Sequence, residues 1–207
     1  MTKYGTRDGV NTVKKLIVND KIVMQYLIPK TVAVATGALL TAHNFHTAST
    51  AVTNVGLAIQ PPYPINIVMC PNVAGTAGGN DIITVAGEDQ FGDNISENFI
   101  VAATAAATTA GKKAFGKIDT ISIYSGQSDT NTTIKSTSIG FGYGKIVGLP
   151  WPIETNDDVI SYTYDGAYAT TAVDELTIDT EYNTMSMPTM GAGVTASVIY
   201  KTKLQKR

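Results

Sequence analysis

The chain of 207 residues is long enough for one large domain or two small ones, since domains commonly have about 100 to 200 residues. Charged residues make up 15% of it, well below the roughly 25% of an ordinary globular protein, and 29 threonines, whose β-branched side chains suit strands, fill part of the difference. The formal net charge of -2 argues against a nucleic-acid partner, and the lack of any apolar run near the roughly 18 residues of a membrane helix argues against a membrane partner.

The first twelve residues are polar and punctuated by glycine, which predicts an extended N-terminal arm, residues 1–12, without a core of its own. They lack the apolar core of a signal peptide, so we expect synthesis in the cytoplasm. Residues 13–207 are predicted to form one β-rich domain, with a subdivision near the glycine-rich residues 71–80 as an alternative.

Strand patterns begin directly after the arm. Two apolar runs, residues 14–18 and 21–28, are separated by Asn19-Asp20, a pair typical of a tight hairpin. Residues 32–40 fit a strand or a short helix, and their β-branched valines favour the strand. The short continuous apolar run at residues 65–69 predicts a buried strand.

The clearest pattern lies in residues 79–124. Ile83 and Val85 would share one face of a strand and their neighbours the other, which is the two-residue period of a pleated strand. The polar turn formers of residues 88–94 then lead into a second run that begins at Ile95. The order of these segments predicts a β-hairpin.

The rest of the chain continues in the same manner. The alanine-rich residues 102–110 fit a helix or a strand equally well. The glycines of residues 140–144 predict a twisted or bulged strand, because no helix pattern follows them as it would in a phosphate-binding loop. Further strands are predicted at residues 118–124, 132–138, 144–147, 159–164, 175–179 and 194–200. Many short strands without a convincing amphipathic helix predict an all-β fold, either an antiparallel sandwich or a jelly-roll-like barrel.

No group of side chains has the spacing of a catalytic or metal site. His43 and His46 lack the third and fourth ligands that a metal ion needs. The single cysteine, Cys70, rules out an intrachain disulfide and is expected to be a small buried apolar group. Five acidic residues could in principle supply a pair of catalytic carboxylates, but they are expected to be exposed loop acids: Asp157, Asp158, Asp165, Asp174 and Glu175. We therefore expect no enzyme activity, no metal and no cofactor.

Two other sets of side chains allow alternative interpretations. Four aromatic residues could form a sugar-binding platform, although core and interface positions are favoured: Trp151, Tyr162, Tyr164 and Tyr168. The basic residues gather near both ends of the chain, where they are either solvated or dock on an acidic neighbour: Lys3, Arg7, Lys14, Lys15, Lys21, Lys201, Lys203, Lys206 and Arg207.

Two segments carry a resemblance to a known class of protein. Residues 82–97 read IITVAGEDQFGDNISE, and residues 111–121 read GKKAFGKIDTI. This pair of segments resembles one in virion proteins of tailed bacteriophages. It is a structural motif without catalytic residues, and the acidic Glu88 and Asp93 depart from the pattern.

The resemblance implies a capsid decoration or cement protein on the surface of the virion. Such a protein would bind the major capsid protein as a homo-oligomer, with a trimer as one option, and would stabilise the head without catalysis. We expect contacts through the basic arm, with Lys3, Tyr4 and Arg7, and through a second site in the acidic turn, with Glu88, Asp89 and Asp93.

Three other functions stay open at this point. The chain could be a tail-tube or head-completion component of a virion. It could be a carbohydrate-binding or receptor-binding β module that uses Trp151 and the tyrosines. A polysaccharide-cleaving enzyme that uses the loop acids is the third alternative.

Overall fold

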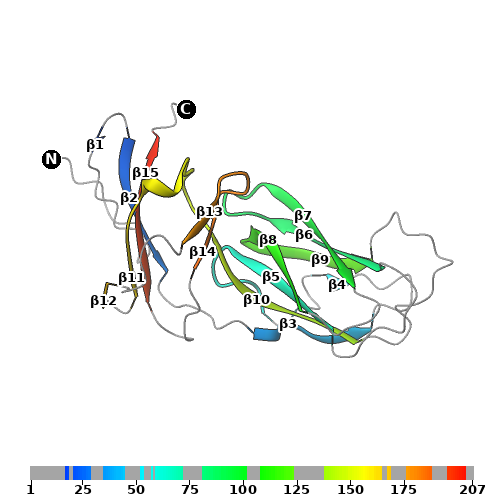
Figure 1. Ribbon diagram of the computed structural model, residues 1–207. Coiled ribbons are helices and arrows are strands. Elements are labelled where there is room, and N and C mark those ends of the chain that lie inside the picture. Colours follow the sequence, from blue (N-terminus) through cyan, green and yellow to red (C-terminus); the bar gives the residue numbers. More distant parts are fainter. Residues whose placement is uncertain are drawn as a thin grey trace. The chain divides into compact units, whose positions relative to one another are not determined.

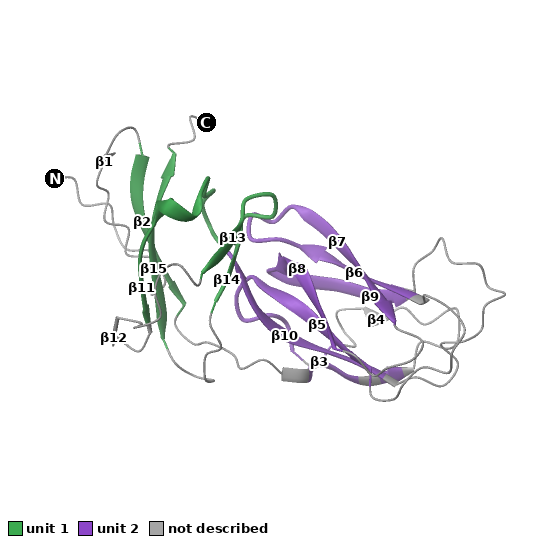
Figure 2. Cartoon of the chain, viewed as in Figure 1, with its two compact units in different colours: residues 1–33, 149–207 green, residues 34–148 purple. Residues whose placement is uncertain are grey.

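The computed structural model divides the chain into two compact units. Unit 1 comprises residues 1–33 and 149–207, and unit 2 comprises residues 34–148 (Figure 2). The structure describes residues 17–18, 21–28, 35–44, 52–53, 57, 59–71, 81–101, 108–123, 138–164, 167–168, 176–187 and 195–203. The expected N-terminal arm, residues 1–12, lies outside the described residues, as does most of the expected subdivision near 71–80, which falls inside unit 2.

Unit 2 is a sandwich of two antiparallel sheets (Figure 1). In the first sheet, β10 lies between β3 and β5, and β8 pairs with the other side of β5. The second sheet has the order β4-β9-β6-β7. The strands are β3 (Ala35–Asn44), β4 (Val52–Thr53), β5 (Ile65–Pro71), β6 (Asp81–Glu88), β7 (Asn94–Val101), β8 (Thr109–Phe115), β9 (Lys117–Ile123) and β10 (Ser138–Gly148).

The predicted hairpin is confirmed, because β6 and β7 pair without a break from Asp81 opposite Val101 to Glu88 opposite Asn94. Its inner face lies in the core, since Ile83 and Val85 are completely buried. Between the two sheets, the ring of Phe99 on β7 meets the ring of Phe141 on β10 edge to face, with centroids 5.8 Å apart. Apolar burial and aromatic packing therefore hold the sandwich together.

The glycine-rich strand β10 is bulged, as its sequence predicted. Its register against β3 shifts before Tyr143, and its register against β5 shifts after Tyr143. Gly144 approaches the side-chain amide of the buried Asn66 so closely that a Cβ atom would collide with it. The Asn66 amide donates to the carbonyl of Gly111 at 2.6 Å and accepts the N–H of Ile146 at 2.9 Å. One buried side chain thus satisfies backbone groups of both strands that flank β5.

Unit 1 contains a sheet in the order β1-β2-β15-β11-β12 and the hairpin β13–β14. The predicted period of two in the last strand is confirmed, because Ala196, Val198 and Tyr200 are completely buried. The elements are β1 (Ile17–Val18), β2 (Lys21–Ile28), the 3-10 helix η3 (Asn156–Asp158), β11 (Val159–Tyr164), β12 (Ala167–Tyr168), β13 (Thr177–Asp179), β14 (Thr184–Ser186) and β15 (Ala196–Lys203).

All described strand pairs are antiparallel, and the described part of the chain contains no α-helix, so the predicted all-β class is correct. The helix alternative for the alanine-rich segment is wrong where it can be judged, since Thr109 and Ala110 begin β8. The strands β4, β8, β12 and β14 were not expected from the sequence.

Candidate interaction interface

The turn that joins β6 to β7 is held together by its own first residue. The Oδ1 atom of Asp89 accepts the backbone N–H of Phe91 at 2.7 Å and of Asp93 at 3.0 Å. The N–H of Asp89 donates to the carbonyl of Asp93 at 2.9 Å, and the N–H of Gly92 donates to the carbonyl of Asp89 at 3.3 Å. Gly92 has a φ of 84°, which glycine adopts without steric cost. The turn therefore has one defined conformation.

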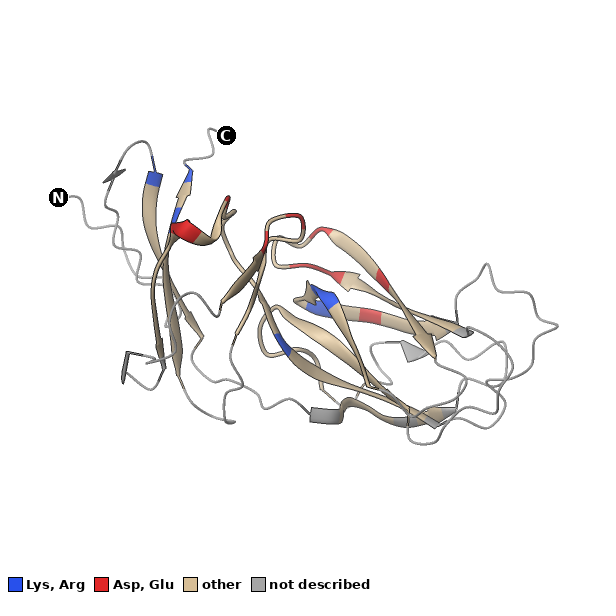
Figure 3. Cartoon of the chain, in the orientation of Figure 1, with Lys and Arg blue, Asp and Glu red and all other residues tan. Residues whose placement is uncertain are grey.

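The carboxylate of Glu88 is engaged beside the turn. Lys117, at the start of β9, lies 2.7 Å from Glu88 and 2.9 Å from Asp119. Its hydrogen bond to Glu88, followed by the one to Asp119, raises the pKa of Lys117 above its ordinary value. Figure 3 shows the acidic residues around the β6–β7 turn and the basic residues on β8 and at the start of β9.

The structure thus brings Glu88, Asp89 and Asp93 together in one turn, but their carboxylates have different surroundings. Those of Glu88 and Asp89 bind groups of the same chain. Asp93 is exposed, and its carboxylate has no hydrogen bond or ion pair within the described residues. The other predicted contact residues, Lys3, Tyr4 and Arg7, lie outside the part of the chain that is described.

A glutamate joins the two sheets of unit 2 where their end strands, β7 and β8, lie side by side. The carboxylate of Glu97 on β7 accepts the backbone N–H of Lys112 at 2.6 Å and of Lys113 at 3.3 Å, both on β8. In return, the Lys113 ammonium donates to the carbonyl of Ser96 at 2.8 Å. We call this contact the seam, because side-chain hydrogen bonds there connect two strands that the ladder pairing does not.

Glycine and burial both shape the seam. A Cβ atom on Gly111 would collide with the Glu97 carboxylate, so a larger residue at this position would displace the Glu97 side chain from the seam. Burial raises the pKa of Glu97, although the N–H groups of Lys112 and Lys113 act in the opposite direction. Sequence reasoning did not single out Glu97; the Ser-Glu and Gly-Lys-Lys sequences of the two motif segments were the available signal.

The two motif segments, residues 82–97 and 111–121, form one structural unit. Besides the seam, the N–H of Gly116 donates to the carbonyl of Glu88 at 2.8 Å. Gly87 lies so close to the carbonyl of Lys117 that no Cβ atom fits between them. Residues 82–97 and 111–121 are therefore fastened to each other at the turn and again at the seam.

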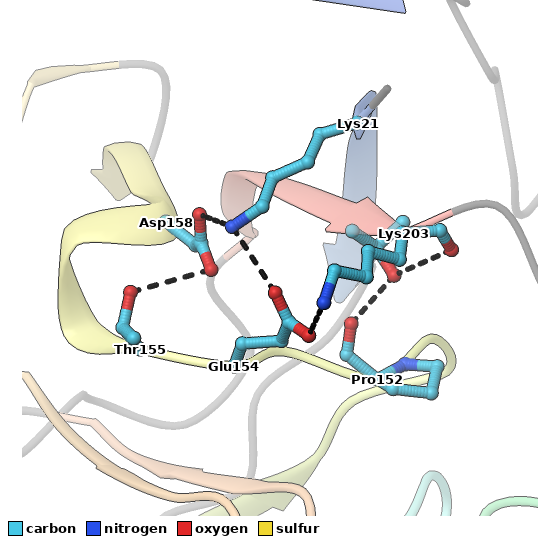
Figure 4. A network of polar contacts seen from close by, with 7 residues as sticks. Lys21, Pro152, Glu154, Thr155, Asp158 and Lys203 are labelled. Atoms are coloured by element: carbon cyan, nitrogen blue, oxygen red, sulfur yellow. Dashed lines mark hydrogen bonds and ion pairs between the residues drawn. The ribbon is translucent and has the colours of Figure 1, made fainter. Parts of the chain in front are cut away.

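A second polar cluster lies in unit 1 (Figure 4). The Lys21 ammonium is 2.6 Å from Asp158 and 3.3 Å from Glu154, and the Lys203 ammonium is 2.5 Å from Glu154. Lys21 and Lys203 are directly opposed in the β2–β15 ladder, where two like charges repel each other. Glu154 binds both lysines and so offsets their repulsion.

This cluster of two lysines and two carboxylates changes two expectations, one about the loop acids and one about the basic residues. Asp158 is 4% exposed, so the expectation of an exposed loop acid is wrong for this residue. Burial acts to raise the pKa of Asp158, but the hydrogen bond and charge of Lys21 outweigh it, and the pKa lies below its ordinary value. The two basic residues Lys21 and Lys203 have their acidic neighbours within the chain. Asp165, Asp174 and Glu175 lie outside the described residues.

The structure describes some of the remaining candidate residues. Cys70 is buried, as predicted, and burial raises the pKa of its thiol. Tyr162 is 4% exposed and belongs to the core. Trp151 is half-buried, and its backbone N–H donates to the hydroxyl of Tyr200. His46 is not described, and the described residues contain no group of three or more His, Cys, Asp or Glu side chains that could hold a metal ion.

No protein-family model, no curated protein and no solved structure matches this chain. Within the described residues there is no helix long and apolar enough to cross a membrane. The function is therefore inferred from the residues and contacts described above.

Proposed function

We propose that this chain is a non-enzymatic virion protein that decorates the head of a tailed bacteriophage. It binds the major capsid protein as a homo-oligomer and stabilises the shell. The observation that supports the proposal is the unit formed by residues 82–97 and 111–121, whose sequences resemble phage virion proteins. The described polar contacts of these segments fasten strands to each other, which suits a protein that acts by shape and assembly.

Such a protein needs no reaction in order to work. Binding across the junctions between capsid subunits stabilises the bound shell by mass action, by about 2.7 kcal/mol when the free protein is at 100 times its dissociation constant. A turn that is already fixed by hydrogen bonds, like that of residues 88–94, loses little conformational entropy on binding. A surface with few charges also suits repeated contact with other protein.

The direct test is binding to expanded phage shells that lack this protein. We expect saturable binding at a fixed number of copies per shell in sedimentation assays, and a higher melting temperature of the shell in calorimetry. Replacing the basic residues of the arm, as in K3S/R7S, should weaken binding. The matched control K145S changes an exposed lysine on β10 and should bind like the wild type.

Three results would contradict the proposal. Absence of shell binding, or binding without any change in shell melting, would reject a cement role. Polymerisation of the purified protein into tubes would favour a tail-tube component. A change in the fluorescence of Trp151, the single tryptophan, on addition of glycans would favour a carbohydrate-binding module.

A further inference from the structure

The tip of the β6–β7 turn carries a large apolar side chain that the fold does not bury. Phe91 is 49% exposed, and the neighbouring residues 92–94 are exposed as well. A Cβ atom built on Gly92 would have no atom within 4 Å, so the tip is sterically open. We propose that Phe91 is the anchor of this interface and inserts into an apolar pocket with a basic rim on the capsid subunit.

The framework of the turn distinguishes Phe91 from an ordinary exposed apolar residue. Single apolar side chains on a surface are normal, and Ile59, Ile100 and Ile160 are similarly exposed. Only Phe91, however, lies in a turn whose backbone is fixed on both sides by Asp89, which accepts its N–H at 2.7 Å. A rigid aromatic side chain on a fixed backbone has the properties of an interface hot spot.

The charges around the tip define the chemistry of the pocket. Glu88 is paired with Lys117, and Asp89 accepts two N–H groups of the turn, so neither carboxylate is available to a partner without breaking these contacts. Asp93 adds one exposed negative charge beside Phe91. Complementarity therefore requires an apolar pocket for the ring and a lysine or arginine at its rim for Asp93.

A two-fold contact between the turns of two copies fits this chemistry less well. In such a contact, the described basic residue beside each turn would be Lys117, which already binds two carboxylates, Glu88 and Asp119. The proposal consequently specifies the capsid subunit as the partner, and it rests on the proposed decoration function.

The test compares four proteins on the same expanded shells: the wild type, F91S, D93N and I160S. The last is a matched control, because Ile160 is 45% exposed and lies in unit 1. All four should have the same thermal midpoint, since none of the changed side chains is buried. We expect F91S to weaken shell binding roughly tenfold or more and D93N to weaken it by a smaller factor that vanishes in high salt. I160S should leave the affinity unchanged.

Different outcomes would refute the role of Phe91 as an anchor and the proposed decoration function. If the wild type binds shells and F91S binds within a factor of two of it, the anchor is refuted and the decoration function stands. If the wild type does not bind, the decoration function fails, and the anchor on a capsid subunit falls with it. A photo-crosslinking amino acid at position 91 gives a second readout. Crosslinks to a capsid peptide with apolar and basic residues support the proposal, and crosslinks to a second copy of this chain overturn it.

Discussion

The seam makes a quantitative prediction about the stability of unit 2. In Glu97→Ala, the backbone N–H groups of Lys112 and Lys113 lose their acceptor. The net contribution of an ordinary hydrogen bond is about 0.5–1.5 kcal/mol. Because the bond to Lys112 is exposed and the one to Lys113 is only partly buried, we take this net value for each bond, which gives a loss of about 1–3 kcal/mol for the pair.

Urea and thermal unfolding measure this loss directly. A loss of about 1–3 kcal/mol corresponds to a fall in melting temperature of about 2–12 °C for a chain of this size. Ser96→Ala is the matched control, because it removes an exposed side chain from the neighbouring position and leaves the carbonyl that binds Lys113 in place. Its free energy of unfolding should change by no more than about 0.5 kcal/mol.

Amide exchange locates the effect in the structure. In Glu97→Ala, the amides of Lys112 and Lys113 should exchange faster, while the amide of Phe115, inside the first sheet, keeps its protection. The reasoning is refuted if Glu97→Ala is as stable as Ser96→Ala, or if these two amides keep wild-type protection.

The raised pKa of Glu97 predicts the direction in which the stability of the fold changes with pH. Burial raises this pKa in the folded state, so folding favours the protonated form. The titration of Glu97 therefore stabilises the fold below the ordinary glutamate pKa, and this contribution is lost as the pH rises through the raised value. Compared with Glu97→Gln, which does not titrate, the wild type should gain stability as the pH falls through that interval. A difference that stays constant with pH would contradict the assignment.

Two further substitutions test the framework of each unit. In unit 1, Glu154→Gln should lower the thermal midpoint, because the charges of Lys21 and Lys203 then oppose each other without the carboxylate between them. Adding Lys203→Thr should restore part of the lost stability. Equal midpoints of the single and double variants would contradict this prediction. Since its lysine partners hold the pKa of Glu154 below its ordinary value, this stabilisation should be present above the ordinary glutamate pKa and lost as the pH falls through the lowered one. In unit 2, Asn66→Ala leaves a carbonyl and an N–H of flanking strands unpaired and should cost about 2–4 kcal/mol in urea unfolding. A loss below about 1 kcal/mol would show that water replaces the amide.

The strands that could be predicted were those in which apolar and polar residues alternate along the sequence, because one face of the strand is buried. β6 and β15 have apolar residues at alternate positions, and Ile83, Val85, Ala196, Val198 and Tyr200 on their inner faces are buried as expected. β8 was missed because Gly111 and the two lysines that follow it have no apolar alternation. Its position is fixed by contacts with residues far away in the sequence, namely Glu97 and Asn66.

The location of the candidate site could be predicted from the sequence, but its side-chain contacts could not. Turn-forming residues identified the loop at residues 88–94, and the structure places a tight turn there. The sequence could not reveal that the carboxylates of Glu88 and Asp89 are bound within the chain. That outcome depends on Lys117, 29 residues away from Glu88, and on the local geometry of the turn. Phe91 was overlooked because the exposure of an aromatic residue is a property of the folded chain.

The distribution of charge connects the framework to the proposed function. In the described residues, Lys117, Lys21 and Lys203 bind carboxylates of this chain, and Glu97 and Asp89 accept backbone N–H groups. These charges therefore stabilise the fold and are largely neutralised within it. In the proposed interface, the β6–β7 turn would offer a partner mainly the shape of its tip and the exposed ring of Phe91. Recognition by shape and apolar contact depends little on ionic strength, whereas recognition through charges alone would weaken steeply with added salt.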